Sequence, residues 1–137
     1  MMKRNTMTMD SRSRLRDVPG FQGLSDQTLA QIEALSTEIT VDKGHLLTRQ
    51  GGAGREAFII VDGTAAFWRT GEACTVLSPG ALVGELALME GLPRNGNVVA
   101  VTQLRVLVLN PAEFNSLCED LDFGAWVLKQ ADEHKHG

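Results

Sequence analysis

The sequence predicts a small, mainly β domain: an antiparallel roll or sandwich with one helix before it and two helices after it. Seven short runs of extended character lie between residues 38 and 109, and turns rich in glycine separate them. Helical spacing of apolar residues occurs only before and after this region. The length of 137 residues and the hydrophobic content of 43% are those of a single ordinary globular domain.

The first helix is expected to begin after Ser25, a favourable N-cap residue, and to end near Ser36. Its apolar face consists of Leu29, Ile32 and Leu35. Residues 15–23 form a lead-in to this helix, because Pro19 and Gly20 break regular structure there.

The expected strands are 38–41, 45–50, 57–61, 64–69, 74–77, 98–102 and 105–109, with a further strand that stops at Gly84. Asp62-Gly63 lies between two apolar runs, and this pattern predicts a two-residue β-hairpin. Further turns are predicted at 43–44, 51–52, 70–71 and 78–80.

Two helices are predicted at the end of the chain. Asn110, Pro111 and Glu113 match an N-cap, a first helical position and a capping box. The apolar face of this helix consists of Phe114, Leu117, Cys118 and Leu121. A second helix is expected from Phe123 to about Lys135.

The net charge of −4 is unevenly distributed along the chain. Residues 1–16 hold five basic side chains and one acidic side chain, a balance of +4, so the rest of the chain carries −8. An acidic body argues against nucleic-acid binding, which needs a basic face. We expect residues 1–14 to be a disordered basic tail and residues 15–137 to form the single domain.

The sequence also indicates the cellular compartment in which the protein is expected. No apolar run approaches the ~20 residues of a membrane span, and the N-terminal residues do not match a secretory signal. Cys74 and Cys118 have neither metal-site nor redox-motif spacing. We therefore expect a cytoplasmic protein with free thiols.

Residues 82–94 combine the residue types that most indicate a ligand site. A strand is expected to stop at Gly84 and turn into a short helix, whose free backbone amides can donate to an anion. Glu85 is an acceptor suited to sugar hydroxyls, and Arg94, after Pro93, presents a planar fork suited to a phosphate diester.

This segment resembles the phosphate-binding cassette of the cyclic nucleotide-binding domains, the β-rolls of the bacterial catabolite activator, protein kinase A regulatory subunits and nucleotide-gated channels. The matching positions are Gly84, Glu85, Ala87, Leu88, Pro93 and Arg94. Residues 41–44, Gln50-Gly51 and Asp62-Gly63 resemble the early strands and turns of that family. The resemblance implies an antiparallel β-roll of double-stranded jelly-roll type, with a short helix in the cassette.

The resemblance also implies a role for each residue of the cassette. Glu85 would accept a hydrogen bond from the ribose 2′-hydroxyl, and Arg94 would pair with the exocyclic oxygens of the cyclic phosphate. The implied cyclic nucleotide-binding residues are Gly84, Glu85, Leu86, Ala87, Arg94 and Asn95, with the backbone amides of Ala87 and Asn95 completing the cradle.

The base is expected to lie against apolar residues of the roll, under a lid from the last helix. The candidates for this pocket are Val76, Leu77, Val83 and Trp126. Trp126 is preferred for the lid over Val127 and Leu128 because of its large stacking face. Packing of Trp126 in the core is an equally open interpretation.

Two departures from the family pattern bear on the ligand. Val83 replaces the usual aromatic residue, and Asn95-Gly96-Asn97 follows the arginine where two small residues or a threonine are expected. Gly96 is expected to add flexibility, and the pattern does not distinguish cAMP from cGMP.

No enzymatic activity and no cofactor are expected, because no nucleophile–base arrangement is present. A metal-dependent cupin, also a small β-roll, is disfavoured because only His45 lies in the predicted strands.

The first hypothesis is a stand-alone sensor of cAMP or cGMP that signals through a protein partner or a homodimer, unless the chain is a fragment. The alternative is a degenerate roll that acts as an interaction or scaffold module without nucleotide.

Overall fold

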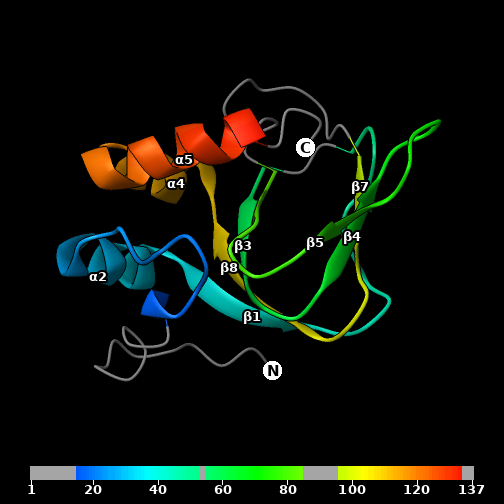
Figure 1. Ribbon diagram of the computed structural model, residues 1–137, viewed down its shortest axis with the longest axis horizontal. Helices are drawn as coiled ribbons and strands as arrows, with labels where there is room; N and C mark the ends of the chain where they lie inside the picture. The colour runs from blue at the N-terminus through cyan, green and yellow to red at the C-terminus, as the bar shows by residue number, and fades with distance from the viewer. Residues whose placement is uncertain (1–14, 53–54, 85–95, 134–137) are drawn as a thin grey trace.

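The computed structural model describes residues 15–52, 55–84 and 96–133. Two four-stranded antiparallel sheets form a β-roll at one side of the molecule, and the three helices of the described residues pack at the other side (Figure 1). The predicted antiparallel roll with flanking helices is therefore confirmed.

The first sheet has the order β1-β8-β3-β6 and the second has the order β2-β7-β4-β5. The strands of the first sheet are β1 (Thr37–Val41), β8 (Leu104–Leu109), β3 (Ala57–Asp62) and β6 (Leu82–Val83). The strands of the second sheet are β2 (Leu46–Thr48), β7 (Asn97–Ala100), β4 (Ala65–Trp68) and β5 (Thr75–Leu77). Each predicted extended run overlaps one of these strands, and the strand ends differ from the predicted ones by at most two residues.

The predicted hairpin at Asp62-Gly63 is wrong, although the turn exists. β3 pairs with β8 and β6, whereas β4 pairs with β7 and β5, so the turn carries the chain from one sheet to the other. Gly63 has a φ of +95°, and a Cβ there would lie 2.4 Å from the carbonyl oxygen of Gln103. Glycine is required at position 63 because the Gln103 carbonyl lies too close for a side chain, not because the turn joins the two strands of a hairpin.

The helix ends follow local sequence signals closely. Helix α2 (Asp26–Leu35) is capped by Ser25, whose side chain accepts from the Thr28 backbone N–H at 3.1 Å. Helix α4 (Pro111–Cys118) begins with the predicted capping box, in which Asn110 and Glu113 exchange two hydrogen bonds of 2.8 Å. Both predicted N-caps are confirmed.

Helix α5 (Leu121–Glu133) begins two residues before the predicted Phe123. The Asp120 carboxylate accepts from the backbone N–H groups of Asp122 (2.9 Å) and Phe123 (3.1 Å), so it acts as the N-cap. The same carboxylate accepts from the hydroxyl of the buried Thr28, which ties the start of α5 to α2.

The first sheet separates two hydrophobic cores. Along β3, Ala57 and Ile59 point toward the helices, whereas Phe58 and Ile60 point into the roll, as the two-residue period of a strand requires. The helical core includes Phe21, Leu29, Ile32, Phe114, Leu117, Phe123 and Trp126. The roll core includes Phe67, Val83, Val98, Leu104 and Val106. Both faces of β3 are buried, which explains its continuous apolar run.

The lead-in before α2 is held by side chains that cross it. Arg16 donates to the Leu24 carbonyl (3.1 Å) and pairs with Asp26 (2.6 Å). The Gln22 amide donates to the carbonyls of Arg16 (2.7 Å) and Val18 (3.0 Å). These bonds hold the intervening residues of the lead-in against the helical core and the roll.

Candidate functional site

Strand β6 leads into the candidate site and ends at a glycine. Leu82 and Val83 pair with Ile59 and Phe58 of β3, at the edge of the first sheet. Gly84 follows with a φ of +87°, a conformation that L side chains rarely adopt. The predicted strand that stops at a glycine is therefore present.

The central residues of the candidate site lie outside the described residues. These are Glu85, Leu86, Ala87, Arg94 and Asn95. Their assignment to a nucleotide therefore stays a prediction, and the described residues define how the chain enters and leaves the segment.

The chain leaves the segment at Gly96, which is tightly packed. The Thr48 hydroxyl donates to the Gly96 carbonyl at 3.0 Å, and a Cβ on Gly96 would lie 2.4 Å from the Phe67 ring. The expectation that Gly96 adds flexibility is thus replaced by a packing role: the ring leaves no room for a side chain.

Asn97 holds the start of β7 through its side chain. Its Oδ1 accepts from the Gln50 backbone N–H at 2.9 Å, and its Nδ2 donates to the Trp68 carbonyl at 3.4 Å. Gln50 in turn accepts from the Thr70 backbone N–H at 3.1 Å. Sequence reasoning missed this network because its members come from three segments that are far apart in the sequence. The only local signal was an asparagine at the edge of a strand.

These contacts anchor both ends of the segment between residues 84 and 96. The chain enters this segment from β6, the edge strand of the first sheet, and leaves it into β7, an inner strand of the second sheet. A ligand held by this segment would thus contact a connection between the two sheets, and a shift of either sheet would move one of its ends.

The structure brings together only some of the candidate base-pocket residues. Leu77 and Val83 belong to the roll core. Val76 is 66% exposed, because neighbouring residues of β5 point to opposite faces. Val83 on the first sheet and the partly buried Leu77 on the second sheet thus both pack on the roll core, and Val76 faces solvent.

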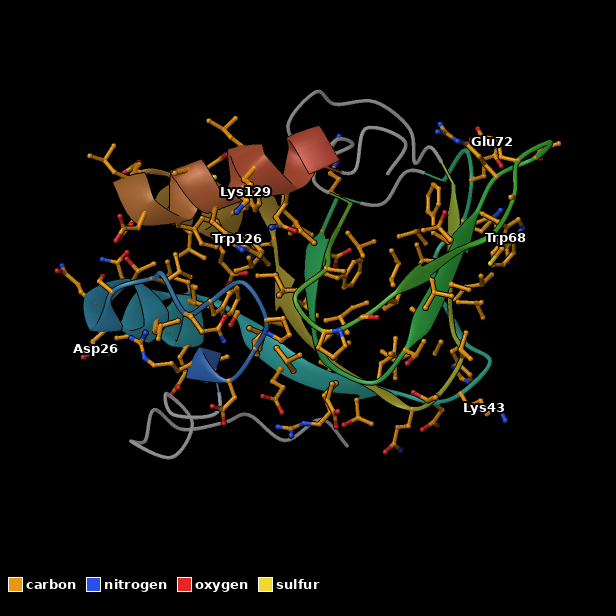
Figure 2. The ribbon with its side chains drawn as sticks, viewed as in Figure 1. Asp26, Lys43, Trp68, Glu72, Trp126 and Lys129 are labelled. Atoms are coloured by element: carbon orange, nitrogen blue, oxygen red, sulfur yellow. The ribbon has the colours of Figure 1, made fainter. Side chains whose placement is uncertain are left out.

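Trp126 belongs to the helical core in this conformation. Its side chain is 6% exposed, and its ring centroid lies 5.2 Å from that of Phe21 and 5.6 Å from that of Phe123 (Figure 2). A Cβ added to Gly20 would lie 3.2 Å from its Nε1 atom. This matches the core-packing interpretation, and stacking on a base would require α5 to move away from the lead-in.

Asp120 offers a direct test of the junction between α4, α5 and α2. We expect Asp120→Ala to lower the free energy of unfolding by about 1–2 kcal/mol, because the N-cap and the partner of the Thr28 hydroxyl are both lost. Chemical denaturation followed by circular dichroism measures this. The control is Glu119→Ala, which removes an adjacent exposed carboxylate. Equal stability of the two variants would contradict a capping role.

Three arginines of the described residues are already paired with carboxylates. Arg16 pairs with Asp26, Arg69 with Glu72, and Arg105 with Glu38. The Nε of Arg105 lies 2.9 Å from a carboxylate oxygen of Glu38. The pairs of Arg16 and Arg105 join residues distant in sequence, and the pair of Arg69 and Glu72 lies within one turn.

The described residues offer little other chemistry. Among them, no group of three or more histidine, cysteine, aspartate or glutamate residues is placed to hold a metal ion. Burial raises the pKa of the Cys118 thiol, which lowers its thiolate fraction at neutral pH. No helix in the described part of the chain is long and apolar enough to cross a membrane.

The arrangement of two antiparallel sheets and flanking helices is that of a small β-roll domain. The family model of the cyclic nucleotide-binding domain matches residues 38–120. This chain belongs to the cyclic nucleotide-binding domain family.

Curated relatives of two kinds are similar to it. A cyclic nucleotide-gated potassium channel of Mesorhizobium japonicum is 36% identical over 88% of this chain and 33% of its own length. A cAMP-dependent protein kinase regulatory subunit of Schizosaccharomyces pombe is 31% identical over 77% of this chain and 26% of its own length. The chain thus spans a third or less of the length of these relatives.

Solved structures show the same fold. The regulatory domain of Toxoplasma gondii protein kinase A, crystallised with cAMP, superposes with a TM-score of 0.74 at 24% identity. The superposition covers 91% of this chain and 49% of that one.

Proposed function

We propose that this chain binds a cyclic nucleotide, cAMP or cGMP, at residues 84–95 and acts as a non-enzymatic cytoplasmic sensor. The observation that carries the proposal is the anchored connection between the two sheets, which begins at a left-handed glycine and contains the residue types of the family cassette. The relatives named for cyclic nucleotides and cAMP support the ligand class.

In this proposal the phosphate is held by charge and by backbone amides. Arg94 pairs with the exocyclic oxygens, and the amides of Ala87 and Asn95 donate to the same group. Glu85 accepts from the ribose hydroxyl, and Gly84 and Leu86 position the turn.

The base lies against Leu77 and Val83, which pack on the roll core from different sheets. Val76 would contribute only from the solvent face. Trp126 can cover the base only if α5 leaves the contacts with Phe21, so capping by this ring is a shift between two packed states. Signal output then passes through a protein partner or a homodimer.

We expect Arg94→Ala to weaken nucleotide binding about ten- to a hundredfold, since it removes hydrogen bonds to a charged group. Isothermal titration calorimetry with cAMP and cGMP in parallel measures this, and micromolar affinity is expected for the wild type. The control is Lys43→Ala, which removes one positive charge from the exposed turn between β1 and β2 (Figure 2). Equal affinities of wild type and Arg94→Ala would exclude Arg94 from the site.

The second candidate is a roll that binds no nucleotide and serves as an interaction module. The large exposed side chains Leu121 and Leu128 on α5, together with Asn95-Gly96-Asn97, favour it. Thermal unfolding with excess cAMP or cGMP separates the candidates, because a ligand at ~100 times its dissociation constant adds about 2.7 kcal/mol of stability. An unchanged melting temperature with both nucleotides would favour the interaction module.

A further inference from the structure

The outer face of α5 carries an apolar stripe that nothing in the described structure covers. Leu121 is 88% exposed and Leu128 is 65% exposed, and the exposed Ala125 lies between them. The spacing of four and then three residues places all three on one face of the helix. The opposite face carries Phe123, Trp126 and Val127, which are buried in the helical core. Packing of this domain therefore accounts for one face of α5 and leaves the other unexplained.

The charged residues beside this stripe can pair with the same residues of a second copy of the chain. Asp122 and Lys129 are both exposed and lie seven residues apart, so they flank the stripe on the same side, near its two ends. A two-fold axis at Ala125 that pairs two α5 helices antiparallel brings Asp122 of one copy to Lys129 of the other, twice. The same operation brings Leu121 of one copy to Leu128 of the other.

A parallel pair of α5 helices lacks these two charge pairs. Its two-fold axis runs along the helices, so Asp122 and Lys129 of one copy face the side of the partner helix that carries Gly124 instead of Asp122 and Lys129. The apolar residues alone fit both directions, and the charges favour the antiparallel one.

We propose that the stripe of Leu121, Ala125 and Leu128 is a homodimer surface, on which α5 of a second copy packs antiparallel. The small side chain of Ala125 lets the two helices approach at the axis. Helix α5 lies at the outer edge of the helical layer, where a second molecule can reach it (Figure 1). The proposal goes beyond nucleotide binding and does not depend on it.

One helix face per copy buries less than the ~1,000 Å² of a stable interface, so the dimer is weak and reversible. Sedimentation equilibrium over protein concentrations of about 0.01–1 mM, without nucleotide, covers the range of such contacts. We expect the dimer fraction of the wild type to rise across this range. A protein that stays monomeric at about 1 mM would overturn the proposal.

Substitutions then locate the surface. Leu121→Gln and Leu128→Gln should each abolish the dimer, and because both side chains are exposed the melting temperature of the monomer should stay unchanged. The matched control is Val76→Gln, which alters an equally exposed apolar side chain on β5 and should dimerise as the wild type does. Dimers that persist in both leucine variants would place the interface elsewhere and overturn the proposal.

A charge swap tests the direction. Asp122→Lys and Lys129→Asp should each raise the dissociation constant about three- to tenfold, since two attractive pairs per dimer become repulsive. The double variant should return it toward the wild-type value. Single swaps without effect, in a dimer that still needs Leu121 and Leu128, would overturn the antiparallel arrangement.

Discussion

Replacing Phe123 by alanine is expected to lower the free energy of unfolding by about 3–5 kcal/mol. Phe123 is completely buried, and its ring centroid lies 6.1 Å from that of Phe114 and 5.6 Å from that of Trp126. It therefore joins α4 to α5 within the helical core, and Trp126 extends that core to Phe21 of the lead-in. Its removal leaves a cavity lined by side chains of α4 and α5, and two packed helices cannot fully collapse into it.

Urea unfolding of both proteins, followed by circular dichroism, measures the effect. The matched control is Leu121→Ala, which lies two residues away on the same helix but is 88% exposed, and it should change the stability by less than about 0.5 kcal/mol. A cost below about 1 kcal/mol for Phe123→Ala would show that α5 does not pack here as described. The comparison separates core packing from any general effect of shortening a side chain in α5.

Gly80→Ala is expected to lower the stability by at least about 2 kcal/mol. Gly80 has a φ of +97°, and a Cβ there would lie 2.3 Å from the carbonyl oxygen of Pro19. Its backbone N–H donates to the Ile60 carbonyl at 2.8 Å, so the turn cannot move away freely. The substitution thus combines an unfavourable backbone conformation with a clash against the lead-in.

The control for this substitution is Gly71→Ala. Gly71 has a similar φ of +84°, but nothing lies within 4 Å of a Cβ added there, so only the conformational cost of about 1 kcal/mol applies. The difference between the two variants, measured by chemical denaturation, isolates the close approach to Pro19. Equal losses would contradict the packing of the lead-in on this turn.

Gly80 also matters for the candidate site, because the turn it forms leads directly into β6 and Gly84. The lead-in contacts this turn through Pro19 and contacts α5 through Phe21 and Trp126. A movement of the turn at Gly80 can therefore reach α5 through packed atoms.

Helix caps were the most predictable features of this chain. Ser25 and the pair Asn110 and Glu113 act on backbone groups within three residues, so the local sequence contains all the partners. The strands were found for the same reason: short apolar runs between glycine turns need no knowledge of the partner strand.

Strand pairing was not predictable from the same local signals. Asp62-Gly63 has the composition of a hairpin, yet β3 and β4 lie in different sheets, because β3 pairs with β8 and β4 pairs with β7, two strands that come much later in the sequence. The role of Asn97 and the need for glycine at position 96 also arise from residues distant in sequence, namely Gln50, Trp68 and Phe67.

The amino-acid sequence by itself determined the element types, the N-caps of α2 and α4, and the family, since these depend on short-range patterns and on the residues at 84–94. Only the tertiary structure decided that Trp126 packs among Phe21 and Phe123, that Val76 faces solvent, and that α5 leaves two leucines uncovered. The reason is physical: a helix or strand carries its own hydrogen-bonding and apolar pattern, but which of its faces is buried depends on what the rest of the chain packs against it.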